Sequence, residues 1–380
     1  MDNLTHSFIG LAASKAGLEK LSPGTTALCL LAANAPDGDI VTLIFGRWAY
    51  LQHHRGITHS IVGTLALALA LPLVFYLVDA LIARIRSGAR TVRLRGLLLA
   101  SVVASATHPL MDWTNNYGVR FLLPWDPRWF YGDLVFIIDP LLWMVLGGAV
   151  FLLTSETKRQ MAGWLVVGLI TSYLVFFGPA NRGGLANATL LRIVWLVALV
   201  GLVVLFKKQA GKRWGAKIPG AAFVIVGCYL AGLFFIHTMA LRHAQFEAST
   251  IALENNEHTI EVAAMPTLAN PLKWLGVGET ERAAYRFNLS LTGSSGRRSN
   301  VVRFEKPDAS SSRALDQALR DSRAQVFLGF ARFPVVRIVG EDCTTQTLVQ
   351  FADLRYTEPG RDRGTFALEL PVNCPPPEIK

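Results

Sequence analysis

Long apolar runs constrain this chain more than any other feature of its sequence. A helix needs ~20 mostly apolar residues to cross ~30 Å of hydrocarbon. Two shorter runs, at 4–20 and 24–36, flank Ser22-Pro23-Gly24 and predict a helical hairpin that enters the membrane without spanning it cleanly. Six longer runs approach the spanning length: 58–83, 95–113, 134–153, 162–178, 190–206 and 218–240. We therefore predict a mainly α, polytopic membrane bundle of about 6–8 helical segments.

The composition changes near residue 240. Overall, 52% of the residues are hydrophobic and 17% are charged, below the ~25% charged residues of typical soluble domains. The apolar runs lie in 1–240, whereas 241–380 is a mixed polar sequence. Strand-like runs separated by turn residues, with one helix-like run at 310–326, predict a soluble α+β domain there. The strand-like runs are 259–264, 285–291, 301–304, 335–339, 347–351 and 365–370. We predict a membrane domain over 1–240 and a soluble domain over 241–380.

Basic residues gather in short connections between the apolar runs. Short cytoplasmic loops retain Lys and Arg, so these connections are expected to be cytoplasmic. A third connection, 154–161, then also lies inside, and 37–57, 113–133 and the C-terminal domain lie outside. This placement also argues against a nucleic-acid surface, which needs a contiguous basic face, although the net charge is +10. The basic residues are Arg84, Arg86, Arg90, Arg93 and Arg95 in one connection, and Lys207, Lys208, Lys212, Arg213 and Lys217 in another.

The four cysteines show no metal-binding spacing. Cys29 and Cys228 fall in apolar runs and are expected to be packing residues. Cys343 and Cys374 lie in the predicted soluble domain, and whether they form a disulfide stays open. The start of the chain lacks the basic stretch and cleavage site of a signal peptide, so we expect no cleavage there.

Histidine and aspartate residues of the membrane half fall into four groups. On the predicted topology the last three groups lie at the outward ends of their segments, and the first joins them if its helix runs inward. Five of the eight histidines of the chain then lie at one membrane level. The groups are His6; Asp37 and Asp39; His53, His54 and His59; and His108 with Asp112.

These residue types are the usual nitrogen and oxygen ligands of zinc and related cations. His108 and Asp112 are four residues apart and face one side of a helix. Asp37 and Asp39 put two carboxylates on a turn. The ligand number exceeds what one tetrahedral ion needs, so we expect two or more divalent ions, zinc first and manganese as the alternative. Two-metal centres suit phosphoester hydrolysis.

Each group also has a simpler interpretation. A single histidine in an apolar helix is more often a hydrogen-bonded interior residue, and Pro36-Asp37-Gly38 alone is an ordinary turn. Arg55 could anchor the membrane interface or bind a phosphate. Asp139, which precedes Pro140, is expected to start a helix or support a ligand. The convergence of the four groups favours metal binding.

The motifs that carry these groups resemble those of the YdjM/YbcI-type family of bacterial inner-membrane, metal-dependent hydrolases. The resemblance covers about residues 1–155, with weaker signals beyond. It implies a multipass inner-membrane protein with a His/Asp metal centre, distantly similar to zinc-dependent phospholipase C. It does not supply a substrate. The motifs are the opening Met1-Asp2-Asn3-Leu4-Thr5-His6-Ser7, then Pro36-Asp37-Gly38-Asp39, then His54-Arg55-Gly56-Ile57-Thr58-His59-Ser60, then His108-Pro109-Leu110-Met111-Asp112.

From these observations we expect a membrane-bound metal-dependent hydrolase that acts on a phosphoester of a lipid or lipid-linked molecule at the outer face of the inner membrane. Arg55 would steady the phosphoryl oxygens, and His53 would act as a substitute ligand or general base. A metal or proton transporter is the first alternative, because buried His and Asp also mark ion pathways. A structural metal site with a partner-binding C-terminal domain is the second. The expected metal ligands are His6, Asp37, Asp39, His54, His59, His108 and Asp112.

Overall fold

A computed structural model describes residues 1–178, 188–292, 299–307, 312–340, 347–361 and 364–373. The chain forms two compact units, and helix α11 (Lys217–Glu254) contributes to both. The first unit comprises Met1–Gly38, Arg55–Ile236 and Pro266–Pro271, and the second comprises Asp39–His54, His237–Met265 and Leu272–Lys380.

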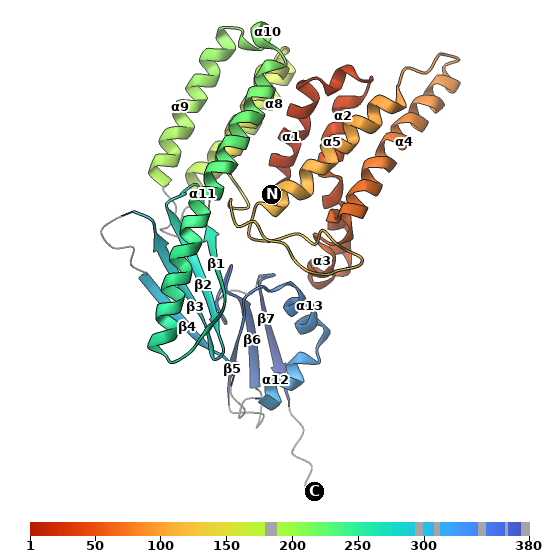
Figure 1. The fold of residues 1–380 in the computed structure, drawn as a ribbon. Helices are drawn as coiled ribbons and strands as arrows, with labels where there is room; N and C mark the ends of the chain where they lie inside the picture. The colour runs from red at the N-terminus through yellow and green to blue at the C-terminus, as the bar shows by residue number, and fades with distance from the viewer. Residues whose placement is uncertain (179–187, 293–298, 308–311, 341–346, 362–363, 374–380) are drawn as a thin grey trace. The chain divides into compact units, whose positions relative to one another are not determined.

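Helices build the first unit, as the apolar runs predict (Figure 1). Helix α1 packs on α2, α2 and α4 pack on α5, and α8 packs on α9. Within the described residues this unit contains α1 (Asn3–Lys15), η1 (Leu18–Lys20), α2 (Thr25–Asn34), η3 (Ile57–His59), α4 (Ile61–Ile85), α5 (Leu94–Trp113), α6 (Pro140–Leu142), a π-helical turn η4 (Trp143–Gly147), α7 (Gly148–Thr154), α8 (Lys158–Phe177), α9 (Ala188–Lys207), α10 (Ala210–Trp214) and the first part of α11.

Six segments within the described ranges are long and apolar enough to cross a membrane. They are Thr25–Phe45, Ile61–Ile85, Leu94–Trp113, Lys158–Phe177, Thr189–Lys207 and Lys217–Glu254. This finding confirms the membrane bundle.

These six segments differ from the six predicted spans at two places. The predicted span 134–153 instead begins at Pro140 and forms the shorter apolar helix Pro140–Thr154. Asp139 caps its start, because its side chain accepts a hydrogen bond from the Leu141 backbone amide at 2.8 Å. Val135 before it is extended and pairs with Asn115. The second short run, by contrast, continues through the 3₁₀ segment η2 (Ala35–Phe45).

Two sheets and two short helices form most of the second unit, which confirms the predicted α+β region. The four-stranded sheet has the order β1-β2-β3-β4 and the three-stranded sheet has the order β5-β6-β7. The pairs β2–β3, β3–β4, β5–β6 and β6–β7 are antiparallel. The strands are β1 (Thr259–Pro266), β2 (Lys273–Thr280), β3 (Ala283–Ser290), β4 (Ser299–Glu305), β5 (Pro334–Val339), β6 (Thr347–Asp353) and β7 (Ala367–Val372).

A segment from early in the chain belongs to this second unit. Helix α3 (Arg47–His53) packs against α13 (Ser322–Phe330), and Trp48 contacts the core formed by α12 (Ser312–Leu319), α13, β6 and β7. The unit is therefore assembled from segments that lie far apart in the sequence.

Two local features depart from the sequence prediction. The single helix expected at 310–326 is two helices, because Asp321 accepts a hydrogen bond from the Arg323 amide at 2.8 Å and starts α13 anew. Strand β2 was missed because Gly276 and Gly278 weaken its strand pattern. A side chain at Gly276 would meet the Phe287 ring on β3 at 2.3 Å, so the close packing of these strands requires glycine.

The cysteines of the first unit differ in burial. Cys29 is buried, as predicted, whereas Cys228 is exposed on α11. Cys343 and Cys374 lie outside the described residues.

Candidate metal centre

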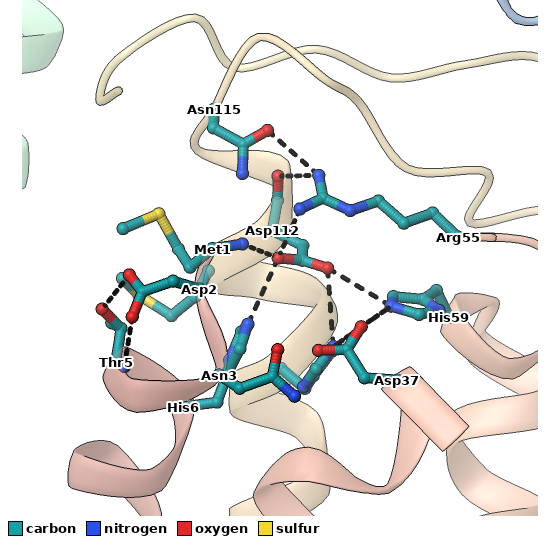
Figure 2. Close-up of polar contacts among 12 residues, drawn as sticks. Met1, Asp2, Asn3, Thr5, His6, Asp37, Arg55, His59, Asp112 and Asn115 are labelled. Carbon is teal, nitrogen blue, oxygen red and sulfur yellow. Dashed lines mark hydrogen bonds and ion pairs between the residues drawn. The ribbon is translucent and has the colours of Figure 1, made fainter. Parts of the chain in front are cut away.

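Four of the predicted ligands meet in the first unit. Asp37 comes from the start of η2, His59 from η3, and His108 and Asp112 from one face of α5. Each offers one ligand atom, and these four atoms lie within 4.8 Å of one another. Figure 2 shows Asp37, His59 and Asp112 turned toward a common point. His59, His108 and Asp112 are fully buried.

The spacing of these atoms matches a tetrahedral cation site. His59 Nε2 lies 3.1 Å from His108 Nε2, and 3.3 Å from both Asp37 Oδ1 and Asp112 Oδ2. His108 Nε2 lies 3.5 Å from the same two oxygens. Metal–ligand distances of about 2.0–2.2 Å, as for zinc, give a tetrahedral edge of roughly 3.3–3.6 Å. Five of the six separations among the four donor atoms are thus close to the edges of a tetrahedral site for one cation.

Hydrogen bonds orient the two imidazole rings toward this point. His108 Nδ1 lies 2.6 Å from the carbonyl oxygen of Ala33, which only accepts, so Nδ1 donates the proton. In the neutral ring Nε2 then carries the free lone pair. His59 Nδ1 contacts Thr58 Oγ1 at 3.0 Å. Such contacts on the far ring nitrogen are typical of metal-binding histidines.

The local sequence around His59 explains its position. The 3₁₀ turn η3 packs directly on the first turn of α4, and Ser60 caps that helix by accepting a hydrogen bond from the Gly63 amide at 3.1 Å. A Cβ at Gly63 would lie 1.7 Å from the Ile57 carbonyl oxygen. Only glycine lets η3 approach so closely and so bring His59 to the centre.

Asp112 uses its two carboxylate oxygens differently. Oδ1 accepts from Arg55 Nη2 at 3.0 Å, lies 3.3 Å from His6 Nε2, and pairs with the Met1 amino group. Oδ2 faces the two histidines and receives no hydrogen bond from the described residues. A buried carboxylate oxygen without a hydrogen bond is costly. A cation at the centre of the four donors satisfies this oxygen, so the residues present fit a metal ion.

Arg55 holds Asp112 in place (Figure 2). Its guanidinium donates to the Asp112 carboxylate and to Asn115 Oδ1, both at 3.0 Å, and to the Gly118 carbonyl oxygen at 3.3 Å. It also lies 4.6 Å from the centre of the Tyr117 ring. The structure thus places Arg55 at the metal centre, with its positive charge directed at a ligand.

Sequence reasoning missed the partners of Asp112 and Arg55. Asn115 and Tyr117 follow Asp112 within five residues, but they read as ordinary loop residues. The Met1 amino group gave no signal. The closeness of Asn115 and Tyr117 to Asp112 in the sequence was the signal that could have identified these two residues.

His6 and Asp139 lie outside the four-residue group. The His6 ring stacks on His108 with their centres 3.8 Å apart. It contacts Asp112, as described above, and its role as a ligand stays a prediction. Asp139 caps α6 and accepts a hydrogen bond from Tyr229 Oη at 2.7 Å, which agrees with the expected helix start.

The remaining predicted site residues belong to the second unit. His54 Nδ1 lies 3.0 Å from Asp39 Oδ1, and the His54 ring stacks on Tyr50 with centres 4.6 Å apart. Asp39 is buried. His53 is exposed. The assignment of these three residues to a metal site or to catalysis stays a prediction.

Comparison with known proteins confirms the family resemblance for the N-terminal half. Residues 1–183 match the YdjM inner membrane protein family. YfhP of Bacillus subtilis (strain 168), described as uncharacterized, is 26% identical over 154 residues, which cover 38% of this chain and 43% of that protein. The chain thus spans less than half the length of this relative. No solved structure matches the chain.

Proposed function

We propose, from the YdjM family match and the geometry of the metal centre, that this protein is a membrane-bound metal-dependent hydrolase. Its proposed substrate is a phosphoester of a lipid or lipid-linked molecule at the outer face of the bacterial inner membrane. One observation carries the proposal. Four donor atoms from three segments lie within 4.8 Å of one another, and one of them, the buried Asp112 Oδ2, receives no hydrogen bond from the described residues.

The proposed ligands are Asp37, His59, His108 and Asp112. Two nitrogens and two carboxylate oxygens suit zinc best, with manganese as the alternative. When bound, such a cation neutralises phosphoryl charge and lowers the pKa of a coordinated water. Asp39 and His54 are proposed ligands of a second ion.

The other residues of the first unit serve the ligands. We assign Arg55 to positioning Asp112, because three of its hydrogen bonds fix the guanidinium beside that carboxylate and the loop after it. His6 restricts the same carboxylate from the other side. Direct contact of Arg55 with a phosphoryl oxygen, and proton transfer by His53, stay predictions.

Hydrolysis is tested with the purified full chain on a chromogenic phosphodiester and on bacterial lipid extract, with and without chelator. We expect turnover that chelator abolishes and zinc or manganese restores. In His59→Ala and in Asp37→Asn the rate of turnover should fall at least a hundredfold. His258→Ala, whose side chain is 88% exposed, is the matched control. Tight metal binding without turnover on either substrate would favour a transport or structural role instead.

Sidedness is tested separately with reporter fusions after residues 88, 125, 210 and 380. The proposed topology counts the shorter helix Pro140–Thr154 as a further crossing. It predicts signals from the inside, outside, inside and outside, respectively. An inside signal at 125 or 380 would place the metal centre or the C-terminal domain on the other face.

A further inference from the structure

An apolar cavity of about 590 Å³ lies among the helices of the first unit. Its walls come from α1, the π-helical turn with α7, α8 and α9. The cavity has the size of a small-molecule binding site. Large side chains on its walls include Phe8, Trp143, Phe151, Trp164 and Trp195.

The hydroxyl oxygens of the cavity wall already have hydrogen-bond partners within the protein. Thr171 Oγ1 donates to the Val167 carbonyl oxygen at 2.9 Å, and Ser172 Oγ accepts from Trp195 Nε1 at 3.0 Å. These hydroxyls therefore gain little from a polar ligand. The cavity favours a purely apolar occupant.

The cavity also has the length and access that a hydrocarbon chain needs. Its wall on α8 runs from Met161 to Ser172, which is about 16 Å at 1.5 Å per residue. That is roughly half of the ~30 Å hydrocarbon core, a length that a single acyl chain can fill. Leu165 and Leu169 on the same wall are exposed on the membrane-spanning helix α8, so the cavity is open sideways to lipid.

One end of the cavity borders the start of α1, the helix whose His6 contacts the candidate ligand Asp112. The Trp143 ring lines the cavity, and its Nε1 donates to Asp2 Oδ1 at 3.0 Å and to Thr5 Oγ1 at 3.1 Å. Both acceptors lie at the start of α1, whose His6 contacts Asp112. Trp143 thus connects the wall of the apolar cavity to the polar start of α1.

We infer that this cavity binds one hydrocarbon chain of a lipid whose polar head group lies at the metal centre. The inference rests on the proposed function and names its substrate class: a lipid with a long chain, in place of a free water-soluble phosphoester. The π-helical turn in the wall is consistent with it, because such turns occur frequently at functional sites.

Two glycines on α8 provide a matched pair of variants. An added Cβ meets no atom within 4 Å at either Gly168 or Gly163. Gly168 lines the cavity, whereas Gly163 is not part of its wall. Gly168→Phe therefore fills the cavity, and Gly163→Phe puts the same ring elsewhere on the helix.

The test uses the full chain in phosphatidylglycerol vesicles that contain a phosphatidylglycerol with a photoreactive group near the end of one acyl chain. After irradiation, labelled peptides are identified by mass spectrometry. We expect labels on the cavity walls, with at least a fivefold loss in Gly168→Phe and none in Gly163→Phe. Val203→Phe, which also lines the cavity, and its neighbour Val204→Phe form a second pair on α9 if the first variant does not fold. Equal labelling within both pairs overturns the inference.

Labelling needs no turnover, so this outcome is independent of the hydrolase test. Asp37→Asn should keep the labelling while it loses hydrolysis. Cavity labelling in a protein without phosphodiesterase activity would retain the chain-binding site and reject the proposed reaction. Hydrolysis of the lipid with equal labelling in all variants would retain the proposed reaction and reject the chain-binding site.

Discussion

Replacing Asp37 by Asn tests the metal centre with little disturbance of the fold. Asn has nearly the same shape, but it removes one negative charge from the donor set. The Asp37 carboxylate faces His59 and His108 and makes no ion pair with an arginine or lysine in the described residues. Its loss therefore leaves no buried cation uncompensated, in contrast to a substitution of Asp112.

The magnitude follows from the linkage between binding and folding. The ligands come from three separate segments, so the unfolded chain cannot reproduce the site. At a zinc concentration of 100 times Kd, binding stabilises the folded state by about 2.7 kcal/mol. For a unit of this size, that corresponds to a rise in Tm of about 5–11 °C. A hundredfold weaker site, a loss that substitution of a supporting residue can already cause, retains only about 0.4 kcal/mol, or roughly 1–2 °C.

The assay is thermal unfolding of the detergent-solubilised full chain, with chelator and with zinc at a fixed concentration. The wild type and His258→Ala should show the full rise in Tm, and Asp37→Asn only the small remainder. An equal rise in Asp37→Asn and in the wild type would refute the assignment of Asp37 as a ligand. No zinc-dependent rise in the wild type would refute the metal centre itself.

Three further predictions concern residues that support the two units. Arg55→Met should lower the free energy of unfolding by about 3–5 kcal/mol, because it removes a buried partner of the Asp112 carboxylate; a loss below about 1 kcal/mol in denaturant unfolding would contradict this role. Gly276→Ala should cost about 1–3 kcal/mol, because its Cβ overlaps a phenylalanine ring on β3, whereas Gly329→Ala, with no atom within 4 Å, should be neutral or slightly stabilising. Burial alone would raise the pKa of Glu257, but hydrogen bonds from a threonine hydroxyl and an arginine hold it below its usual range. The Glu257 carboxylate therefore contributes fully to stability above its ordinary pKa, and this contribution is lost as the pH falls through its lowered pKa in the folded protein. Hydrogen exchange of the four-stranded sheet should accordingly depend less on acid pH in Glu257→Gln than in the wild type.

The candidate site was partly accessible from sequence because its ligands sit in short, unusual motifs. His108 and Asp112 share a helix face by their spacing alone. Asp37 and His59 were named from their residue types, yet nothing in the sequence fixed their distance from α5. The sequence likewise did not separate them from Asp39 and His54, which lie in the other compact unit.

Arg55 shows a different limit of sequence reasoning. A guanidinium beside predicted ligands suggests a phosphate contact. In the structure the guanidinium donates to Asp112, Asn115 and the Gly118 carbonyl oxygen, and its contact with a phosphate stays a prediction. Hydrogen-bond partners more than fifty residues away cannot be read from a motif.

The sequence by itself determined the membrane bundle, the α+β region and the chemical types of the ligands, because apolar run length, strand alternation and residue chemistry are local properties. Tertiary structure alone decided which donor atoms converge and which unit the segment 39–54 joins. It also shaped the apolar cavity beside α1. These features depend on contacts between distant segments. If one helix packed a few ångströms away from its place, the sequence pattern would be unchanged but the donor atoms would no longer lie close enough to share one cation.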